Sequence, residues 1–422
     1  MAKFGVCVFE DRGYRGFLPL SYSRAVFELR CGMLSLWEKT FREYGDVSFY
    51  FAARPYLAEV LSERLPFPVN RLQDFDGDGM LFVNGRLLSP PGLAQLVPVE
   101  GKSCSFFADG ELLACRLEAG GLMRQAARPG FFLSPDAAQS LAAGLPRTDV
   151  VATLLTYTWE LVNNNPGQIG TDFERSRQGG KIEGDVDERA VVYNARAVHV
   201  GQGASIDAGV VLDARGGPIF LGANVKVHSP SRVEGPCVVS EDTLLVGGRY
   251  TGGCTFGPCC RIGGEVEQSI FQGHSNKYHE GFVGHSYVGE WVNLGALTTT
   301  SDLKNTYGSV SVIVDGRAVG TNLMKVGSLV GDFTKTGIGT LLDTGAVLGF
   351  SANVFGGKGV LPKDVPCFVW GDGESFETYI PQRAVATARV MMERRGTEMS
   401  PALERLMMRV FEATEEDRRR VL

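Results

Sequence analysis

Three of the chain's five histidines fall within a single short segment, the densest concentration of chemically versatile side chains in the sequence. His274, His279 and His285 lie in GHSNKYHEGFVGHSYVGEWVNLGA. An imidazole titrates near neutral pH, so one of them is a candidate general base for removing a proton from an amine. Lys277 would bind an anionic group through a charge-assisted hydrogen bond, and Asn293 would donate to a developing oxyanion.

Other interpretations of this segment stay open. Zinc is the weaker alternative, because spacings of five and six residues do not place histidines side by side on a helix or strand, and no cysteine lies close. The histidines could instead be polar residues on the outer surface of a β structure. Lys277 could be a solvated surface lysine, and Asn293 could belong to an asparagine ladder inside a coil.

Apolar residues that recur at every sixth position surround this segment. A helix repeats near 3.6 residues and a half-buried strand at two, so this period fits neither as a single element. It is typical of a parallel β-helix, in which each hexad forms one flat side and glycines allow the turn between sides. Glycine is abundant here, with 31 in residues 201–359 against 17 in residues 1–170. The residues in step are Val200, Ile206, Leu212, Leu221, Val227, Val233, Val239, Leu245, Phe282, Val288, Leu294, Leu342, Leu348, Val354 and Val360.

Two stretches break the repeat. Residues 297–328 lose the period and are expected to form an extended loop, and residues 247–281 hold it poorly. Loops that leave a rigid scaffold are common positions for binding groups.

Residues 1–165 have a different pattern, in which apolar strands alternate with helical segments. This pattern predicts a sheet with helices packed on it. The polar, glycine-rich residues 166–190 are interpreted as a linker, and residues 191–370 as the β-helix. The predicted strands are Phe4–Phe9, Val47–Ala53 and Met80–Val83, and the predicted helices are Ala25–Tyr44 and Tyr56–Leu65.

The tail, residues 371–422, is predicted to be helical. One helix runs from Pro381 through Met392 and ends at a cationic turn followed by Gly396. Ser400 and Pro401 supply the cap and the first residue of a second helix, whose apolar stripe indicates a packing face.

Composition excludes several classes of protein. The chain has 422 residues, with 42 Lys and Arg against 48 Asp and Glu, and this net charge of −6 argues against a nucleic-acid binder. No apolar run is long enough to span a bilayer, and the first residues do not look like a secretory signal. The nine cysteines include no CxxC pair, so we expect free thiols in a reducing cytoplasm and no disulfide framework.

The histidine segment, with TTTSDLKNTYGSV after it, resembles the acyltransferase domain of bifunctional N-acetylglucosamine-1-phosphate uridyltransferase/glucosamine-1-phosphate acetyltransferases, and most closely a divergent bacterial clade of them. The resemblance covers most of residues 190–422. It implies a left-handed parallel β-helix that forms a homotrimer, with acetyl-CoA bound between neighbouring subunits. It also implies transfer of an acetyl group to the amine of glucosamine-1-phosphate.

Residue by residue, the resemblance makes His279 the catalytic base. The family's active-site tyrosine falls on Phe282, its substrate asparagine on Asn293 and its phosphate-binding arginine on Arg249. The substrate lysine of the standard enzyme falls near Glu267, so we expect Lys277 to supply that charge instead. The remaining implied substrate contacts are Asn276, Lys277 and Lys304, and the implied CoA contact is Tyr307.

The first half resembles the nucleotidyltransferase (Rossmann-like) domain of the same enzymes through LPLSYSR and TWELVNNN. Its loop EDRGYRGFLPLS could hold phosphate through glycines and through arginines. The family's TRM run and lysine are absent, and Asn84 stands where an aspartate would hold Mg²⁺, which an active domain would require. The residues implied for the nucleotide are Arg12, Arg15, Arg24 and Asn84.

Three functional hypotheses follow. The first is acetyl-CoA-dependent N-acetylation of an amino-sugar phosphate with His279 as the base, coupled to uridylyl transfer that gives UDP-N-acetylglucosamine. The second is an enzyme whose working half is the nucleotidyltransferase, acting on another sugar-1-phosphate with some nucleoside triphosphate. The third is a non-catalytic ligand-binding or assembly protein with a degenerate first domain. No nucleic acid or membrane is expected as a partner.

Overall fold

The computed structural model describes residues 3–45, 47–128, 136–355 and 359–422, which form two compact units. The first unit consists of residues 1–17, 23–29 and 34–157. The second contains residues 158–422 together with two short N-terminal segments, 18–22 and 30–33. Each unit is described by itself below.

A mixed sheet forms the centre of the first unit, in the order β4-β1-β5-β8-β7-β9. β1 pairs in parallel with β4 on one side and with β5 on the other, whereas β8 is antiparallel to β5. All three predicted strands are present, and β1 has the predicted bounds. The strands are β1 (Phe4–Phe9), β4 (Ser48–Ala52), β5 (Gly79–Asn84), β7 (Cys104–Ala108), β8 (Glu111–Glu118) and β9 (Arg147–Asp149).

The predicted helix Ala25–Tyr44 is only half correct. A 3₁₀ turn and the short strands β2 (Arg30–Cys31) and β3 (Leu34–Ser35) replace its first half, and α1 covers Leu36–Tyr44. Gly32 has φ of +80°, and its amide donates to Asn165 Oδ1 at 2.6 Å in the second unit, which no continuous helix would allow. The other helices are α2 (Ala58–Arg64), α3 (Leu93–Leu96), α4 (Gly121–Ala126) and α5 (Ala137–Ala142).

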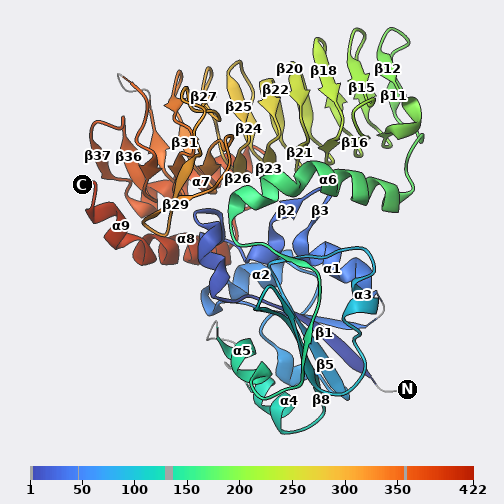
Figure 1. Cartoon of the computed structure of the whole chain (residues 1–422). Coiled ribbons are helices and arrows are strands. Elements are labelled where there is room, and N and C mark those ends of the chain that lie inside the picture. The colour runs from blue at the N-terminus through green and yellow to red at the C-terminus, as the bar shows by residue number, and fades with distance from the viewer. Residues whose placement is uncertain (1–2, 46, 129–135, 356–358) are drawn as a thin grey trace. The chain divides into compact units, whose positions relative to one another are not determined.

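The second unit is a parallel β-solenoid, whose strands stack along its length in Figure 1. One side of the coils is a continuous sheet of nine parallel strands. They are β13 (Val198–Val200), β16 (Ile219–Leu221), β19 (Cys237–Val239), β21 (Cys254–Phe256), β23 (Ile270–Gly273), β26 (Tyr287–Glu290), β30 (Leu329–Val330), β33 (Val347–Leu348) and β35 (Asp364–Val365).

Two further sides of the coils share the other large sheet. Most of its strands are short and belong to one side. β20 and β22 are long enough to continue round a corner, and they join the two sides into one sheet. Its strands are β11 (Asp185–Val186), β12 (Val191–Tyr193), β14 (Ser205–Ile206), β15 (Val211–Asp213), β17 (Lys226–Val227), β18 (Ser231–Glu234), β20 (Leu244–Thr251), β22 (Arg261–Glu267), β24 (Asn276–Lys277) and β25 (Phe282–Gly284). Later coils add β27 (Thr299–Thr300), β31 (Lys335–Thr336), β32 (Leu341–Leu342), β34 (Asn353–Val354), β36 (Val369–Gly371) and β37 (Phe376–Thr378).

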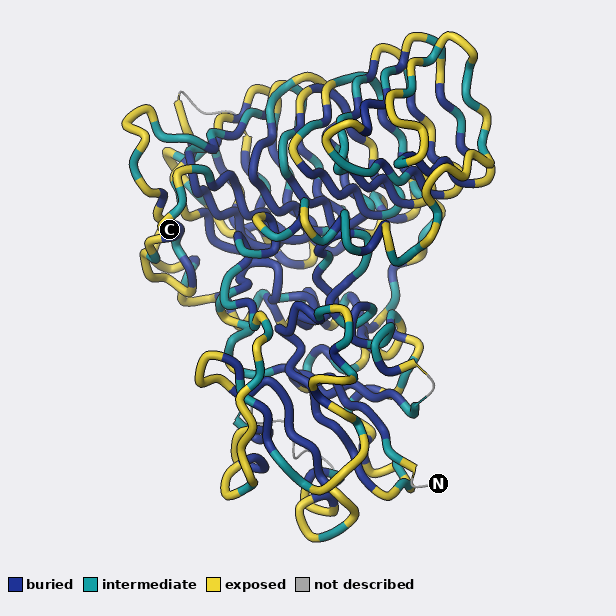
Figure 2. The backbone as a smooth tube through the Cα atoms, turned by 45° about the vertical axis from the view of Figure 1, so that its right-hand side comes forward, coloured by how far each residue is buried: buried dark blue, intermediate teal, exposed yellow. Residues whose placement is uncertain are grey.

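The six-residue repeat predicted which side chains point into the coil, with two exceptions. Thirteen of the fifteen residues in step are buried, and they fill the solenoid core. Phe282 is only half-buried, because its neighbour Val283 takes the inward position, and Val360 is exposed. Figure 2 shows the buried strand residues lining the coils and the exposed residues at many of their corners.

Residues 247–281 are regular coils despite their irregular sequence period. The expected loop 297–328 contains β27 and then a hairpin of β28 (Ser311–Val314) and β29 (Arg317–Gly320). The hydrogen bond from Val326 N to Asp302 O, 2.9 Å long, closes the base of this excursion.

Helices cover parts of the solenoid. α6 (Thr158–Ser176) includes residues 166–176, so the first part of the predicted linker is helical, and Asn165 Nδ2 binds Gly253 O at 2.8 Å. Both predicted tail helices are present as α7 (Pro381–Glu393) and α8 (Pro401–Ala413), and α9 (Glu415–Arg419) follows. Ser400 caps α8 by accepting a hydrogen bond from Leu403 N. Over the residues described, no helix has the length and apolar character needed to cross a membrane.

Candidate functional site

His279 stands at a corner of the solenoid, between β24 and β25. The side chains of Tyr278, His279 and Glu280 are all exposed there. The corner is held from inside the coil, because Lys277 Nζ donates a 2.7 Å hydrogen bond to His279 O. Gly281, with φ of +126°, completes the turn, and a Cβ on it would lie 2.3 Å from Thr298 O of the next coil. The imidazole is therefore presented outward on a fixed backbone.

The three histidines have different environments. His274 stacks on Trp291 with ring centroids 4.4 Å apart, and its Nδ1 is buried without a hydrogen-bond partner among the described residues. His285 is buried, and its Nδ1 lies 2.6 Å from Asp302 Oδ2. Burial alone would raise the pKa of Asp302, but the hydrogen bond and charge of His285 outweigh it and lower that pKa. Only His279 is open to an approaching substrate.

Lys277 does not lie on the surface where a sugar phosphate would bind. It occupies an inward position of β24, paired with Ile262, and its side chain is 1% exposed. Its Nζ donates to Gly263 O at 2.9 Å as well as to His279 O. Burial lowers the pKa of Lys277 to about 8. In this structure Lys277 is an internal anchor of the corner, and its contact with substrate stays a prediction.

Arg249, Glu265 and Phe282 are consecutive rungs of one ladder on the adjoining side of the coils. Arg249 Nη1 lies 3.9 Å from Glu265 Oε1, and both side chains are largely exposed. Glu267, where the family has a lysine, pairs with Lys325 Nζ at 3.0 Å. Lys325, from the end of the excursion, therefore brings a cation to the position where Lys277 was expected to supply one.

Phe282 lies close to the His285–Asp302 pair. A Cβ on Gly284 would be 2.5 Å from both Phe282 Cζ and Asp302 Oδ2, so only glycine allows both side chains to approach. Phe282 has no hydroxyl to donate, whereas the neighbouring carboxylate is buried and paired.

Asn276 and Asn293 lie on a different ladder, which continues from Arg261 through both asparagines to Lys335. Asn276 Nδ2 donates to Asn293 Oδ1 at 3.4 Å. Together with α7 these residues line a groove of about 720 Å³, which is within the size range of small-molecule sites. Asn276 of the groove lies three positions before His279 on one coil, a distance of at most about 10 Å along the chain.

Lys304 and Tyr307 belong to the excursion. Lys304 Nζ donates to Ser309 O at 2.5 Å, and Tyr307 is 69% exposed with φ of +55°. No contact joins either residue to the His279 corner in the described part of the chain.

In the first unit, the carboxyl ends of β1 and β5 form the point at which chain order across the sheet changes direction, where open α/β sheets commonly bind ligands. Asp11 and Asn84 meet there, and Asn84 Nδ2 donates to Asp11 Oδ2 at 2.9 Å. Arg86 binds both oxygens of Asp11 at 2.8 Å and Glu111 Oε2 at 2.6 Å. A Cβ on Gly13 would lie 2.2 Å from Arg86 Nε, so the glycine allows this guanidinium to lie against the loop.

The predicted phosphate-binding arginines are not gathered at this point. Arg24 is 2% exposed, and its contact with nucleotide stays a prediction. Arg12 forms an ion pair with Asp136, and the exposed Arg15 lies over the ring of Tyr14. Asn84 is buried with its amide bonded internally, so it too faces the interior.

Magnesium would bind this group of residues only if Asp11 or Glu111 separated from Arg86. The Arg86 guanidinium forms ion pairs with the carboxylates of Asp11 and Glu111. The side-chain amide of Asn84 donates a hydrogen bond to Asp11. Across the residues described, no cluster of three or more histidine, cysteine or acidic side chains is placed to hold a metal ion.

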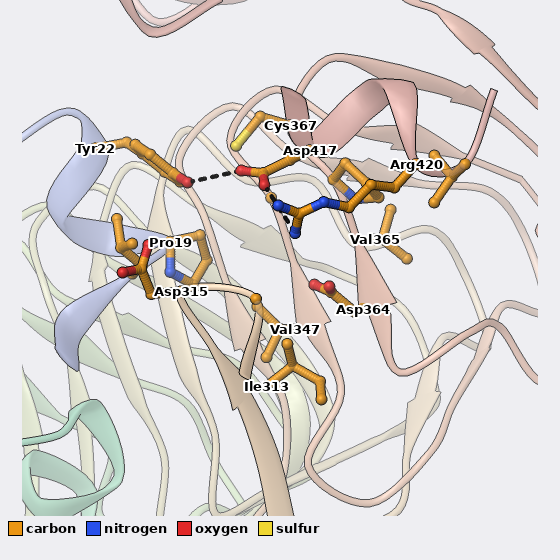
Figure 3. A pocket seen from close by; sticks show the side chains of 15 residues that line it. Pro19, Tyr22, Ile313, Asp315, Val347, Asp364, Val365, Cys367, Asp417 and Arg420 are labelled. Atoms are coloured by element: carbon orange, nitrogen blue, oxygen red, sulfur yellow. Dashed lines mark hydrogen bonds and ion pairs between the residues drawn. The ribbon is translucent and has the colours of Figure 1, made fainter. Parts of the chain in front are cut away.

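A smaller cavity of about 80 Å³ lies near the other end of the solenoid (Figure 3). Tyr22 Oη donates to Asp417 Oδ2 at 3.4 Å, and Arg420 pairs with the same carboxylate. Asp315 from the hairpin and Asp364 also face it. The cavity is too small for a sugar phosphate, and its charges are partly satisfied internally.

Comparison with known proteins shows which enzymes the chain resembles. Residues 6–181 match the family described as sugar nucleotidyl transferase. The chain is 32% identical over 113 residues to the bifunctional sugar-1-phosphate nucleotidylyltransferase/acetyltransferase of Sulfurisphaera tokodaii, which is 27% of each chain. It is 32% identical over 173 residues to the bifunctional protein GlmU of Azoarcus sp. (39% of this chain, 35% of the relative). The bifunctional protein GlmU of Herminiimonas arsenicoxydans is 25% identical over 244 residues (52% and 53%).

The matched segments thus span about a quarter to a half of these relatives' lengths. A solved UDP-N-acetylglucosamine acyltransferase from Campylobacter jejuni aligns with 55% of this chain and 96% of its own, at 10% identity and a TM-score of 0.16, which is too low to establish a common fold. The chain resembles bifunctional sugar-phosphate nucleotidyltransferase/acetyltransferases, with a nucleotidyltransferase-like α/β domain before a parallel β-solenoid and C-terminal helices.

Sequence reasoning missed the partners that surround the predicted residues. Asp302, Lys325 and Lys335 lie far along the chain from the residues they approach, and only the register of the coils brings them together. The sequence contains a weak indication of the Arg86–Asp11 pair, because each residue lies two or three positions after the end of a predicted strand.

Proposed function

We propose that this protein is a bifunctional sugar-phosphate transferase. Its solenoid transfers an acetyl group from acetyl-CoA to the amine of glucosamine-1-phosphate, and its first domain transfers a uridylyl group to the product, giving UDP-N-acetylglucosamine. One observation carries the proposal: a region that matches sugar nucleotidyl transferases is joined, in one chain, to a parallel solenoid that presents His279 outward within the family motif. The Sulfurisphaera relative is named for nucleotidylyltransferase and acetyltransferase activities, and the other two relatives are named bifunctional.

The proposed acyl transfer uses His279 as a general base. The neutral amine of the acceptor attacks the thioester carbonyl, His279 takes a proton from the resulting ammonium, and the CoA thiolate leaves as the carbonyl re-forms. The tetrahedral oxyanion would accept hydrogen bonds from Asn293 or from backbone amides near the corner. Arg249 would bind the substrate phosphate, and Phe282 would contact the sugar ring where the family uses a tyrosine.

We further propose that the site is completed in a homotrimer. Exposed apolar side chains follow the His279 corner along successive coils, and Ile338 is 75% and Leu297 55% exposed. Such a stripe is typical of a surface that another subunit covers. The same stripe includes Tyr278, Leu341, Phe355 and Val360.

The acetyltransferase activity is tested by following free thiol release from acetyl-CoA and glucosamine-1-phosphate. His279→Gln should lower kcat by about 100-fold or more, because general-base catalysis contributes that much. His228→Gln, which changes another solenoid histidine, is the matched control and should leave the rate unchanged. Full turnover by His279→Gln would refute the role given to this residue.

A second candidate function is transfer of a nucleotidyl group to a different sugar-1-phosphate, with the solenoid inactive. The match of residues 6–181 and the naming of the Sulfurisphaera relative for sugar-1-phosphates favour it. Pyrophosphate release from a panel of nucleoside triphosphates and sugar phosphates tests it. Loss of release in Arg15→Ala, with His279→Gln still active in this assay, would support it. An absence of both activities and of CoA and nucleotide binding would favour the non-catalytic alternative.

A further inference from the structure

The groove beneath α7 has an unusual concentration of positive charge. Its solenoid wall is the ladder Arg261–Asn276–Asn293–Lys335, on which each residue lies directly beside the next. Its helical wall is formed by side chains of α7 spaced three to four residues apart and by the turn after it. The helical wall consists of Ala386, Thr387, Val390, Met391, Arg394 and Arg395.

Among the residues that the structure describes, four cations and no carboxylate line this groove. The guanidinium groups of Arg261 and Arg394 form neither ion pairs nor hydrogen bonds with any residue that the structure describes. Arg395 donates to Cys259 O at 3.1 Å and to Asn276 Oδ1 at 2.5 Å. Burial lowers the pKa of Arg395, and the charges of Arg261 and Arg394 lower it further.

The other charges nearby do not cancel this excess. Arg394 and Arg395 lie at the carboxyl end of α7, where the helix macrodipole contributes about half a negative charge. Lys335 donates to Phe333 O at 3.0 Å, and burial lowers its pKa to about 8, so it is still protonated at neutral pH. The carboxylates of Glu241 and Asp242 act on the nearby Cys259 together with Arg395 and Arg261, but neither carboxylate lines the groove, which four cations face. A bound anion would remove their mutual repulsion.

The shape and polarity of the groove narrow the choice of anion. The amides of Asn276 and Asn293 suit hydroxyl or amide groups, and Asn293 Nδ2 has no acceptor among the described residues. Val390 and Met391 add an apolar wall. A volume of about 720 Å³ holds much more than a lone phosphate ion.

We propose that this groove binds a phosphate ester, with Arg261, Lys335 and Arg394 on the phosphate and Asn276 and Asn293 on polar groups of the rest of the molecule. Two ligands of the proposed function share this chemistry, the amino-sugar phosphate and the phosphorylated adenosine end of CoA. The choice between them rests on the proposed function, whereas the phosphate-ester site itself does not. If the ligand is the amino-sugar phosphate, this groove replaces Arg249, which lies on another ladder, as the site of its phosphate.

The test is direct binding to the full chain, measured by isothermal titration calorimetry at low ionic strength. Glucosamine-1-phosphate, CoA, dephospho-CoA and inorganic phosphate are the probes. Arg394→Gln changes an exposed side chain, and Arg261→Gln with Lys335→Gln changes the solenoid wall. Arg383→Gln is the matched control, because Arg383 is an exposed arginine of α7 that does not line the groove.

Each groove variant should weaken binding of at least one phosphate ester by about tenfold, as expected for loss of a charge-assisted hydrogen bond, while the control binds normally. A loss for glucosamine-1-phosphate identifies the sugar phosphate, and a loss for CoA but not dephospho-CoA identifies the CoA 3′-phosphate. Unchanged binding of every probe by all groove variants, or equal losses in the control, would overturn the inference. Binding without turnover would leave the groove in place while counting against the proposed activity.

Discussion

Replacing the buried Lys277 by methionine tests how the solenoid holds the His279 corner. The unfolded chain keeps a lysine protonated up to its ordinary pKa of 10.5, whereas burial lowers the folded pKa to about 8. Between these values the unfolded state binds one more proton, so the free energy of unfolding rises with pH. At 1.36 kcal/mol for each pKa unit, the rise amounts to about 3 kcal/mol between pH 8 and 10.5. Below pH 8 the whole penalty is present.

Methionine removes this dependence, because it has similar length and never carries a charge. At pH 7 the substitution has two opposing effects on stability. Removing the buried ammonium charge stabilises the fold, whereas leaving Gly263 O and His279 O without a donor costs about 1–3 kcal/mol each. The pH dependence therefore separates the two effects better than stability at a single pH.

Urea unfolding followed by tryptophan fluorescence between pH 7 and 10 measures the effect. The free energy of unfolding of the wild type, minus that of Lys277→Met, should rise by about 2–3 kcal/mol across this range. Lys226→Met, at an exposed position of β17, is the control and should leave the difference flat. Parallel curves for wild type and Lys277→Met would refute the lowered pKa and show that the two carbonyl groups keep the ammonium charged.

Three further predictions concern other parts of the molecule. Affinity for a phosphate dianion should fall by up to about tenfold as the pH rises from 7 to 9.5, because Lys335 loses its proton while the arginines of the groove stay charged, and calorimetry on Lys335→Arg should show no such fall. Gly13→Ala should lower the first unit's stability by about 1–3 kcal/mol, seen as a lower urea midpoint, because the new Cβ would displace Arg86 from Asp11. Ile338→Glu should shift the protein to a smaller species in analytical ultracentrifugation, and an unchanged sedimentation coefficient would contradict the proposed subunit interface.

The sequence predicted the two architectures because each depends on a short repeat. The strand and helix alternation of the first domain and the six-residue period of the second are local signals, and tertiary contacts did not override most of them. The helix expected over Ala25–Tyr44 failed because Gly32 takes a left-handed conformation and its amide is drawn to Asn165. Propensity alone could not reveal that contact.

The candidate site was only partly predictable, because the period says whether a side chain points inward but not which residue of another coil it meets. Lys277 illustrates this limit: it fits the family motif as a surface cation, yet its inward position follows from its register with Ile262. Carried back by six from Phe282, the period would have placed Asn276 inside, whereas the inward residues are one position later, at Lys277 and Val283. The motif marks Lys277 as a substrate contact, whereas in the structure its ammonium group donates to two backbone carbonyls inside the coil.

The register of the coils also explains why the phosphate-ester groove has no sequence signature. Its two walls come from residues on four successive coils and from a helix that returns to them after the solenoid ends. The hairpin excursion lies between Asn293 and Lys335. The sequence distance between these two neighbouring rungs is therefore much longer than between the other rungs that line the groove. A substrate site built across coils can therefore exchange a lysine at Glu267 for one at Lys325, and place cations on α7, without altering the motif around His279. Substrate choice in this protein should accordingly follow the excursion and α7, and exchange of these two segments with a relative should change affinity for the acceptor before it changes the pH profile of catalysis.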